Sequence, residues 1–230
     1  PEGMRRLRRQ RKLGRAVPMR VLTRFSKLDM ARYISHLDLL RLMQRVLRRA
    51  QVPLCYTQGF HPHPKMAFAS ALGVGTESRS EYMDLVLDRD VDTRQCVEAI
   101  NRVLPAHIRV LDMKEMDSSA KGLMAMVTAA SYVLTIPMDE GLLDTRCREI
   151  MDAGTWPVTI VKKGKEQDVD IRAGLHRLSV RDGSVDLMVD AGSRRNLNPV
   201  WFVDTLWHKE ERKQGETARI VRTHLYKGNA

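Results

Sequence analysis

Arginine side chains recur at helical spacing between residues 36 and 51 of the 230-residue chain. At about 100° per residue, they fall on one arc of a helix and the apolar side chains fall on the opposite arc. Guanidinium groups make bidentate contacts with phosphate, so a row of them suits a nucleic-acid backbone, although a solvated helix face shows the same pattern. The arginines are Arg41, Arg45, Arg48 and Arg49, and the apolar residues are Leu39, Leu40, Met43, Val46, Leu47 and Ala50.

A stiff loop follows at residues 57–65, with the sequence TQGFHPHPK. Its glycine and two prolines exclude regular structure, and a stiff loop loses little entropy when it binds a partner. Phe60 is placed to stack on a base and Lys65 to contact a phosphate. His61 and His63 can supply half of a metal site, but no further ligand follows at a recognisable spacing. We therefore expect a structural or binding loop and no metal.

His36 is a candidate for catalysis because it occupies the first turn of the expected helix, beside Tyr33 and Asp38. An imidazole there can act as a general acid or base on an RNA 2′-hydroxyl and its leaving oxygen. Packing at the start of a helix is the commoner role for such a histidine. Both interpretations stay open.

A second basic site is expected where Arg194 and Arg195 precede a helix that begins near Asn198. Backbone N–H groups at the N-terminus of a helix favour an anion, and the two arginines add positive charge. An ordinary loop is the alternative interpretation.

Positive charge is concentrated near one end of the chain. The net charge is +11, and residues 1–20 contain eight Lys or Arg and one acidic residue, Glu2. A basic arm of this kind binds nucleic acid or, less often, acidic lipid or protein. A disordered leader is the alternative interpretation.

Cysteine usage and hydropathy exclude several classes of protein. The three cysteines, Cys55, Cys96 and Cys147, are far apart and odd in number, which excludes a disulfide framework and a CxxC-type zinc or iron–sulfur site. No apolar run approaches the length of a membrane span, and the N-terminal region has no hydrophobic signal segment. We expect a reduced, cytoplasmic protein with no membrane contact and no cofactor in this chain.

The elements that hold these residues follow the order strand, helix, strand, strand, helix, strand, which is the ferredoxin-like arrangement. Ser35 is the expected N-cap of the first helix, with Asp38 three residues later, and Asp92 is the expected cap of the second. The expected strands are 19–27, 66–74, 81–87 and 108–113, and the expected helices are 36–51 and 92–103.

The order then repeats, so the sequence predicts an α+β fold of two tandem ferredoxin-like halves. The predicted domains are a basic, disordered arm (1–18), a first half (19–116), a linker (117–129) and a second half (130–230). The elements expected in the second half are strands 132–136, 158–163, 169–180, 184–189 and 219–226, a turn at 164–168, and helices that begin at Asp139 and Asn198 and end near Met151 and Lys209.

Several blocks of sequence resemble the radical-SAM-linked family, a bacterial domain of unknown function that occurs alone or fused C-terminal to B12-binding radical SAM proteins. The likeness covers roughly residues 20–215 and is densest over 33–87. The blocks are Tyr33–Asp38 (YISHLD), Arg48–Arg49, Gln58–Lys65 (QGFHPHPK), Leu72–Gly75 (LGVG) and Glu77–Tyr82 (ESRSEY). The residues of the family motifs are Ser35, His36, Asp38, Gln58, Gly59, Phe60, Pro62 and Pro64.

The resemblance implies partners and a fold. It implies association with a B12-binding radical SAM protein, and the genes of the family often neighbour those of ribonuclease G and two large-subunit ribosomal proteins, which suggests a role with rRNA or the ribosome. It also implies similarity to the CRISPR RNA-processing and repeat-binding proteins, which are tandem ferredoxin-like folds. In some of those proteins a histidine near the first helix assists metal-independent RNA cleavage, and His36 is a loose positional match to it.

Three functions remain open on this basis. The first is an RNA-binding accessory protein that presents rRNA, tRNA or a ribosomal precursor to a radical SAM partner. The second is a metal-independent endoribonuclease that uses His36. The third is a protein-only adaptor for the radical SAM enzyme. We favour the first, in which the chain is not itself an enzyme.

Overall fold

The structure, a computed structural model, describes residues 18–162, 164–193, 195–207 and 217–228. The chain forms a mixed α+β fold, as predicted, and divides into two compact units. Unit 1 comprises residues 1–74 and 78–126, and unit 2 comprises residues 75–77 and 127–230. Of the predicted domains, most of the arm (1–17) lies outside the described residues.

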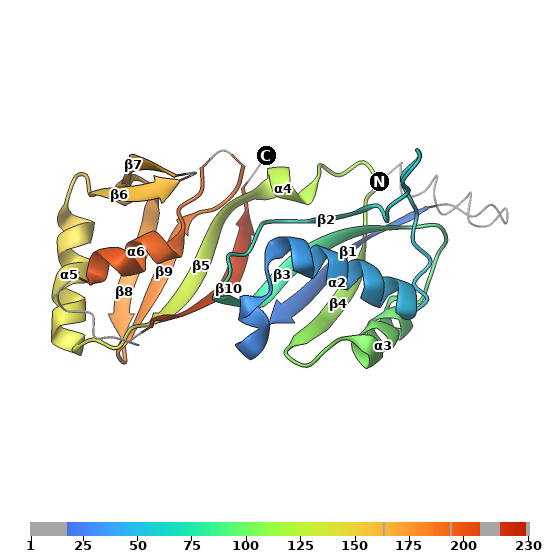
Figure 1. Ribbon diagram of the computed structural model, residues 1–230, viewed down its shortest axis with the longest axis horizontal. Coiled ribbons are helices and arrows are strands. Elements are labelled where there is room, and N and C mark those ends of the chain that lie inside the picture. The colour runs from blue at the N-terminus through green and yellow to red at the C-terminus, as the bar shows by residue number, and fades with distance from the viewer. Residues whose placement is uncertain (1–17, 163, 194, 208–216, 229–230) are drawn as a thin grey trace. The chain divides into compact units, whose positions relative to one another are not determined.

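Unit 1 is an antiparallel sheet with helices on one face (Figure 1). Strand β3 lies between β1 and β2, and β4 pairs with the other edge of β1, so the order is β4-β1-β3-β2. The elements are β1 (Met19–Lys27), η1 (Asp29–Tyr33), α2 (His36–Arg49), β2 (Met66–Phe68), β3 (Thr76–Leu87), α3 (Thr93–Val103), β4 (Ile108–Met116) and α4 (Leu123–Met126), where η marks a 3-10 helix.

The core of unit 1 lies between this sheet and the helices α2 and α3. Alternate residues of β1 point inward, and Val21 and Phe25 are fully buried. The α3 helix is fastened to β4 by the side chain of Asn101, which donates to the carbonyl of Val110 at 2.9 Å and accepts from its N–H at 2.9 Å. These contacts hold α3 against the sheet, and the buried apolar residues of α2 hold that helix beside it, so the outer surface of α2 is left to solvent.

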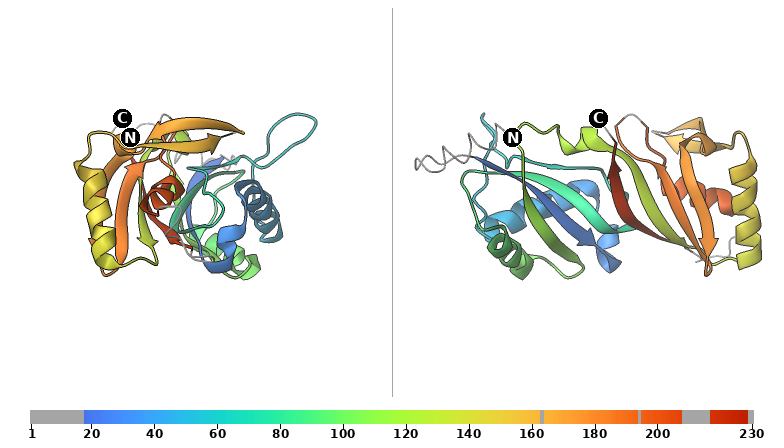
Figure 2. Two further views of the ribbon diagram at one scale, coloured as in Figure 1. Left: turned by 60° about the vertical axis from the view of Figure 1, so that its left-hand side comes forward. Right: turned by 180° about the vertical axis from the view of Figure 1, so that it is seen from behind.

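Unit 2 is also built on an antiparallel sheet, and it has an additional hairpin. Its sheet has the order β10-β5-β9-β8, with antiparallel pairing throughout, and β6 and β7 form a separate two-stranded sheet. Helix α6 lies in front of β8 and β9 in Figure 1 and behind the strands in Figure 2 (right). The elements are β5 (Val127–Thr135), α5 (Glu140–Asp152), β6 (Pro157–Lys162), β7 (Lys165–Asp170), η2 (Arg172–Gly174), β8 (Leu175–Arg181), β9 (Ser184–Asp190), α6 (Pro199–Leu206) and β10 (Arg219–Lys227).

The predicted helix starts are confirmed by side-chain caps. Ser35 Oγ accepts the N–H of Asp38 at 3.2 Å, and Asp92 accepts the N–H groups of Arg94 and Gln95. Asp139 and Asn198 cap α5 and α6 in the same way. Each cap satisfies a backbone donor that has no partner within its helix, which is why these short polar residues mark the boundaries so well.

Several predicted elements differ from the structure. The strand predicted over 81–87 begins five residues earlier, at Thr76, and the strand predicted over 169–180 is interrupted by η2. The segment predicted as a strand over 66–74 is a strand only to Phe68, and the N–H of Ala69 adds one more backbone bond to β3, at the carbonyl of Tyr82. The predicted linker 117–129 contains α4 and the start of β5, where Val127 pairs with Lys227. Residues 165–168, predicted as part of a turn, pair with β6 as part of β7. The last helix ends at Leu206, short of Lys209.

Candidate nucleic-acid interface

Helix α2 separates apolar and basic side chains onto opposite faces, as the spacing predicted. Leu39, Met43, Val46 and Leu47 are buried in the core of unit 1, and Leu40 and Ala50 are partly buried against it. The burial of this stripe fixes the rotation of the helix about its own axis. The arginine face, which comprises Arg41, Arg45, Arg48 and Arg49, is therefore exposed at all four positions.

The positive charge of the arginine face is largely unneutralised. Arg41 forms an ion pair with Asp38 at 3.4 Å, with both side chains about two-thirds exposed, so solvent screens the pair. Arg48 donates from Nε to the carbonyl of Gln44 at 3.2 Å, which leaves its charge intact. Within the described part of the chain, neither Arg45 nor Arg49 forms an ion pair. Over about 12 Å of helix, four guanidinium groups thus face solvent with one weak counter-charge among the described residues.

The loop 57–65 is closed at its base by hydrogen bonds between its two arms. The N–H of Thr57 donates to the carbonyl of His63 at 2.9 Å, and the N–H of His63 donates to Thr57 Oγ1 at 3.1 Å. Further out on each side, the N–H of Lys65 donates to the carbonyl of Cys55 at 2.8 Å. These bonds fix the ends of the loop, while Gly59 at φ +125° supplies a backbone conformation that other residues rarely adopt.

The tip of the loop presents an aromatic ring to solvent. Phe60 is fully exposed, and Gln58, Pro62 and Lys65 are exposed beside it, whereas Pro64 is buried at the base. The loop projects on the side of unit 1 that carries α2 (Figure 2, left). An exposed phenylalanine forgoes its burial energy, about 1.5–3 kcal/mol for a side chain of this kind, and its ring is accessible from solvent.

The structure gives His36 a packing contact. Its ring meets the ring of Phe68 edge-to-face with centroids 5.3 Å apart, and Phe68 in turn meets the buried Phe25 at 5.8 Å. The neighbouring motif residues cap the helix, because Ser35 Oγ also donates to Asp38 Oδ2 at 2.7 Å. This arrangement supports the role in packing at the helix start, and cleavage of RNA by His36 stays a prediction.

The second basic site is described only at Arg195, since Arg194 lies outside the described residues. Arg195 Nη1 donates to the carbonyl of Ala173 at 3.0 Å and lies 3.5 Å from Asp190 Oδ2. Asp190 also lies 2.7 Å from His176 Nε2. Arg195 is thus engaged in contacts within unit 2 that connect the end of β9 to η2, and anion binding at this position stays a prediction.

Metal-ligand and thiol groups do not gather in the described part of the chain. No group of three or more His, Cys, Asp or Glu side chains there is arranged to hold a metal ion. Burial raises the pKa of the Cys147 thiol to about 12 and also raises that of Cys96. Both of these thiols are therefore protonated near neutral pH, which is the opposite of an activated nucleophile.

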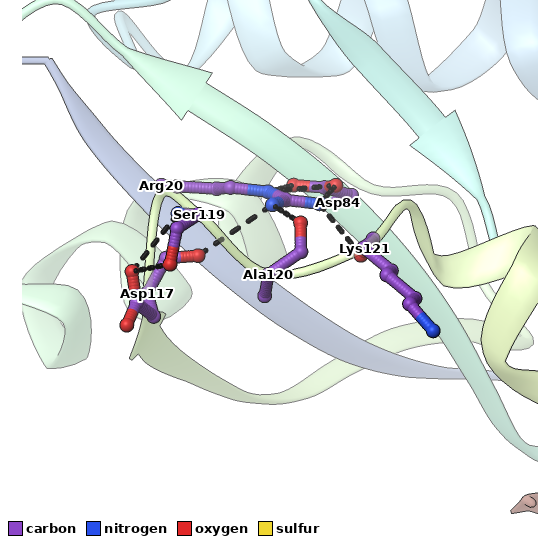
Figure 3. A network of polar contacts seen from close by, with 6 residues as sticks. All are labelled: Arg20, Asp84, Asp117, Ser119, Ala120 and Lys121. Carbon is purple, nitrogen blue, oxygen red and sulfur yellow. Dashed lines mark hydrogen bonds and ion pairs between the residues drawn. The ribbon is translucent and has the colours of Figure 1, made fainter. Parts of the chain in front are cut away.

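One polar network of unit 1 has no signal in the sequence. Arg20 on β1 donates from Nε and Nη2 to the carboxylate of Asp84 on β3, 64 residues away, and from Nη1 to the carbonyl of Ala120 (Figure 3). Both charged side chains are only 12% exposed. The hydrogen bond to Asp84 raises the pKa of the Arg20 guanidinium above its ordinary value. This pair holds the segment 117–121 against the sheet and is structural.

Fold and site together define a class of protein: an α+β protein of antiparallel sheets whose first helix exposes a row of arginines. A family model described as "Uncharacterized protein conserved in bacteria (DUF2344)" matches residues 20–199, and the chain belongs to this family. A search of the curated proteins finds no match. Among solved structures, the chain is similar to one titled "Crystal Structure of an Unknown Protein from Galdieria sulphuraria", at 10% identity and a TM-score of 0.29 over 93% of this chain and 100% of that chain. No helix of the described residues is long and apolar enough to cross a membrane.

Proposed function

We propose that this protein binds RNA through the arginine face of α2, with Phe60 on the loop 57–65 stacking on an unpaired base. The observation that carries the proposal is the exposure of four arginines with one weak counter-ion among the described residues. Like charges at i, i+4 destabilise an isolated helix, and α2 bears this cost because its apolar stripe is buried. Phosphates would relieve the repulsion through charge-assisted hydrogen bonds.

The strand orders support a tandem ferredoxin-like fold as part of this proposal. Unit 1 has the order β4-β1-β3-β2, and unit 2 has the equivalent order β10-β5-β9-β8 once the β6–β7 hairpin is set aside as an insertion. In both units the connections alternate strand, helix, strand, strand, helix, strand. This plan places α2 in a layer on one face of the sheet, with the arginine face of the helix directed to solvent.

We further propose a cytoplasmic accessory role, in which the bound RNA is presented to a B12-binding radical SAM protein. The support is the resemblance of the YISHLD and QGFHPHPK blocks to the radical-SAM-linked family, together with the exposure of Gln58, Phe60 and Pro62 on one loop. The RNA would be rRNA, tRNA or a ribosomal precursor, and an association with the ribosome or ribonuclease G belongs to the same proposal.

The test is RNA binding by a charge-neutral variant of the arginine face, in which Arg41, Arg45, Arg48 and Arg49 are all changed to Gln. We expect its affinity for a labelled single-stranded oligouridine to fall about ten- to hundredfold, measured by fluorescence anisotropy at moderate salt. The slope of log affinity against log salt should become shallower by about 0.7 for each phosphate that the variant no longer neutralises.

A matched control carries the same change in net charge elsewhere in unit 1. Arg89, Arg94, Arg102 and Arg109 are all exposed and lie off α2. Changing these four to Gln should leave the affinity within about threefold of the parent, since only nonspecific attraction is removed. Equal reductions in the two variants, or full retention of RNA binding by the folded arginine-face variant, would refute the proposal.

A specific observation also favours contact with a protein. Three large apolar side chains on η1 and the first turn of α2 are more than half exposed: Met30 at 67%, Tyr33 at 54% and Leu37 at 61%. If this patch docks a B12-binding radical SAM protein, Met30→Ser with Leu37→Ser should abolish capture of that protein while RNA affinity is unchanged. If the double variant still captured the radical SAM protein, the patch would not be the docking site. If the parent captured that protein but bound no RNA, the result would favour the protein-only adaptor over the RNA-binding accessory protein.

A further inference from the structure

The outer face of the unit 2 sheet carries one row of side chains across all four strands. The register places His224 of β10 opposite Ser131 of β5, Ser131 opposite Met188 of β9, and Met188 opposite Arg177 of β8. Side chains directly opposite one another share a face, and neighbouring strands lie about 4.8 Å apart. The row therefore spans about 14 Å, with an imidazole at one end and a guanidinium at the other.

Two rings lie together at the β10 end of this row. The rings of His224 and Tyr226 have centroids 6.1 Å apart and are inclined at 33°. Ser131 Oγ donates to the hydroxyl of Tyr226 at 3.1 Å, which fixes the tyrosine over the neighbouring strand. Both residues are exposed, Tyr226 at 39%, so their faces are accessible to a flat ligand.

The β8 end of the face is basic. Arg177 and Arg181 are exposed, and in the described part of the chain neither of them forms an ion pair. Together with His224 and Tyr226 they line an open hollow of about 350 Å³, in which Asp186 is the one acidic side chain among the described lining residues. The hollow thus combines stacking surfaces, two guanidinium groups and one carboxylate that can accept from an exocyclic amino group.

None of the described helices of unit 2 covers this face. Helix α6 lies on the opposite side of the sheet, where Phe202 and Leu206 are fully buried (Figure 2, right). The residues of β5 and β9 that point to that side, such as Leu134 and Leu187, are likewise buried. The outer row is instead half-buried or exposed.

The outer sheet face of unit 1 provides an internal contrast. Its strand β1 also presents two arginines, but each is paired with a carboxylate: Arg20 with Asp84 at 2.5 Å and Arg24 with Asp112 at 3.0 Å. Positive charge is neutralised there by the protein itself. On unit 2, Arg177 and Arg181 have no acidic partner among the described residues, which is the arrangement expected where the ligand supplies the negative charge.

We propose that the outer sheet face of unit 2 is a second binding surface for single-stranded RNA. One or two unpaired bases stack on His224 and Tyr226, and the adjoining phosphates contact Arg177 and Arg181. Sheet faces with exposed rings bind unpaired RNA bases in this way, because stacking tolerates every base and charge holds the backbone. This surface shares its ligand class with the proposed function but consists of other residues, in another unit.

The test measures binding of a labelled oligouridine to the full chain and to two separate variants. Arg177→Gln with Arg181→Gln should weaken binding about tenfold, and His224→Leu with Tyr226→Leu should weaken it about five- to hundredfold, since leucine fills space but does not stack. Arg148→Gln is the control: this exposed arginine lies on α5, in the helix layer, where it pairs with Asp144. Its affinity should match the parent.

A second readout separates this surface from the arginine face of α2. Photo-crosslinking of oligouridine to the parent, followed by mass spectrometry, should yield adducts on the strand segments 222–227 or 129–133. These adducts should persist in the variant of the arginine face and disappear in the His224 and Tyr226 variant.

Two results would overturn the inference. One is adducts confined to unit 1, and the other is an equal reduction in RNA affinity for Arg148→Gln and for the Arg177 and Arg181 variant. Parental RNA binding by the arginine-face variant, with the strand adducts retained, would overturn the proposed function and support the second surface.

Discussion

An Arg20→Met variant is expected to lose about 3–5 kcal/mol of stability in unit 1. Truncating the guanidinium leaves Asp84 as an uncompensated charge that is only 12% exposed, and removing one partner of such a pair costs far more than the pair contributes. The change also removes the donor to the carbonyl of Ala120, so the segment 117–121 loses its attachment to the sheet. Urea unfolding monitored by circular dichroism measures the destabilisation, and hydrogen exchange at the amides of β1 places it in unit 1.

The chain supplies its own control for this effect. Arg24 also lies on β1 and pairs with Asp112 at 3.0 Å, but these side chains are 40% and 33% exposed. Arg24→Met should therefore cost less than about 1 kcal/mol, as expected for a solvent-screened pair. Arg20→Met combined with Asp84→Leu should recover most of the stability, because no buried charge is then left alone. If Arg20→Met were no more damaging than Arg24→Met, the structural role of the pair would be wrong.

The sequence predicted most where the determining interactions are local. Ser35, Asp92 and Asp139 were identifiable as caps because each accepts an N–H from two or three residues ahead. The two faces of α2 were identifiable because a period of 3.6 residues places them, and the packing of Met43 and Leu47 agrees. Loop 57–65 was identifiable as irregular from its glycine and prolines alone.

Interactions between distant segments leave no local signal in the sequence. Arg20 and Asp84 are 64 residues apart, and nothing near either one indicates its partner. The row from His224 to Arg177 depends on three strand registers, which tertiary packing sets. The burial of Lys27 was missed as well: it is fully buried at the end of β1, where its Nζ donates to the carbonyl of Arg32.

Gly192, just after the end of β9, is a position in unit 2 where a side chain is poorly tolerated. Its φ of +148° lies in a region that residues with a side chain rarely adopt. A Cβ built on it would overlap the carbonyl oxygen of Val127 at the start of β5, and that atom belongs to the backbone. The N–H of Ala191 donates to the carbonyl of Thr128 at 3.0 Å, so the two chain segments cannot separate without breaking this bond.

Gly192→Ala is therefore expected to lower stability by at least about 3 kcal/mol, the sum of backbone strain and displacement of β5 from β9. Urea unfolding measures the total, and hydrogen exchange should show the destabilisation at the β5 and β9 amides. Gly154→Ala is the control, since its φ is not positive and a Cβ there meets no atom within 4 Å; it should change stability by no more than about 0.5 kcal/mol. Because β5 and β9 carry the middle of the row from His224 to Arg177, Gly192→Ala should also weaken any RNA binding by that face. A stable Gly192→Ala protein with parental exchange rates would show that the close approach to Val127 does not hold in solution.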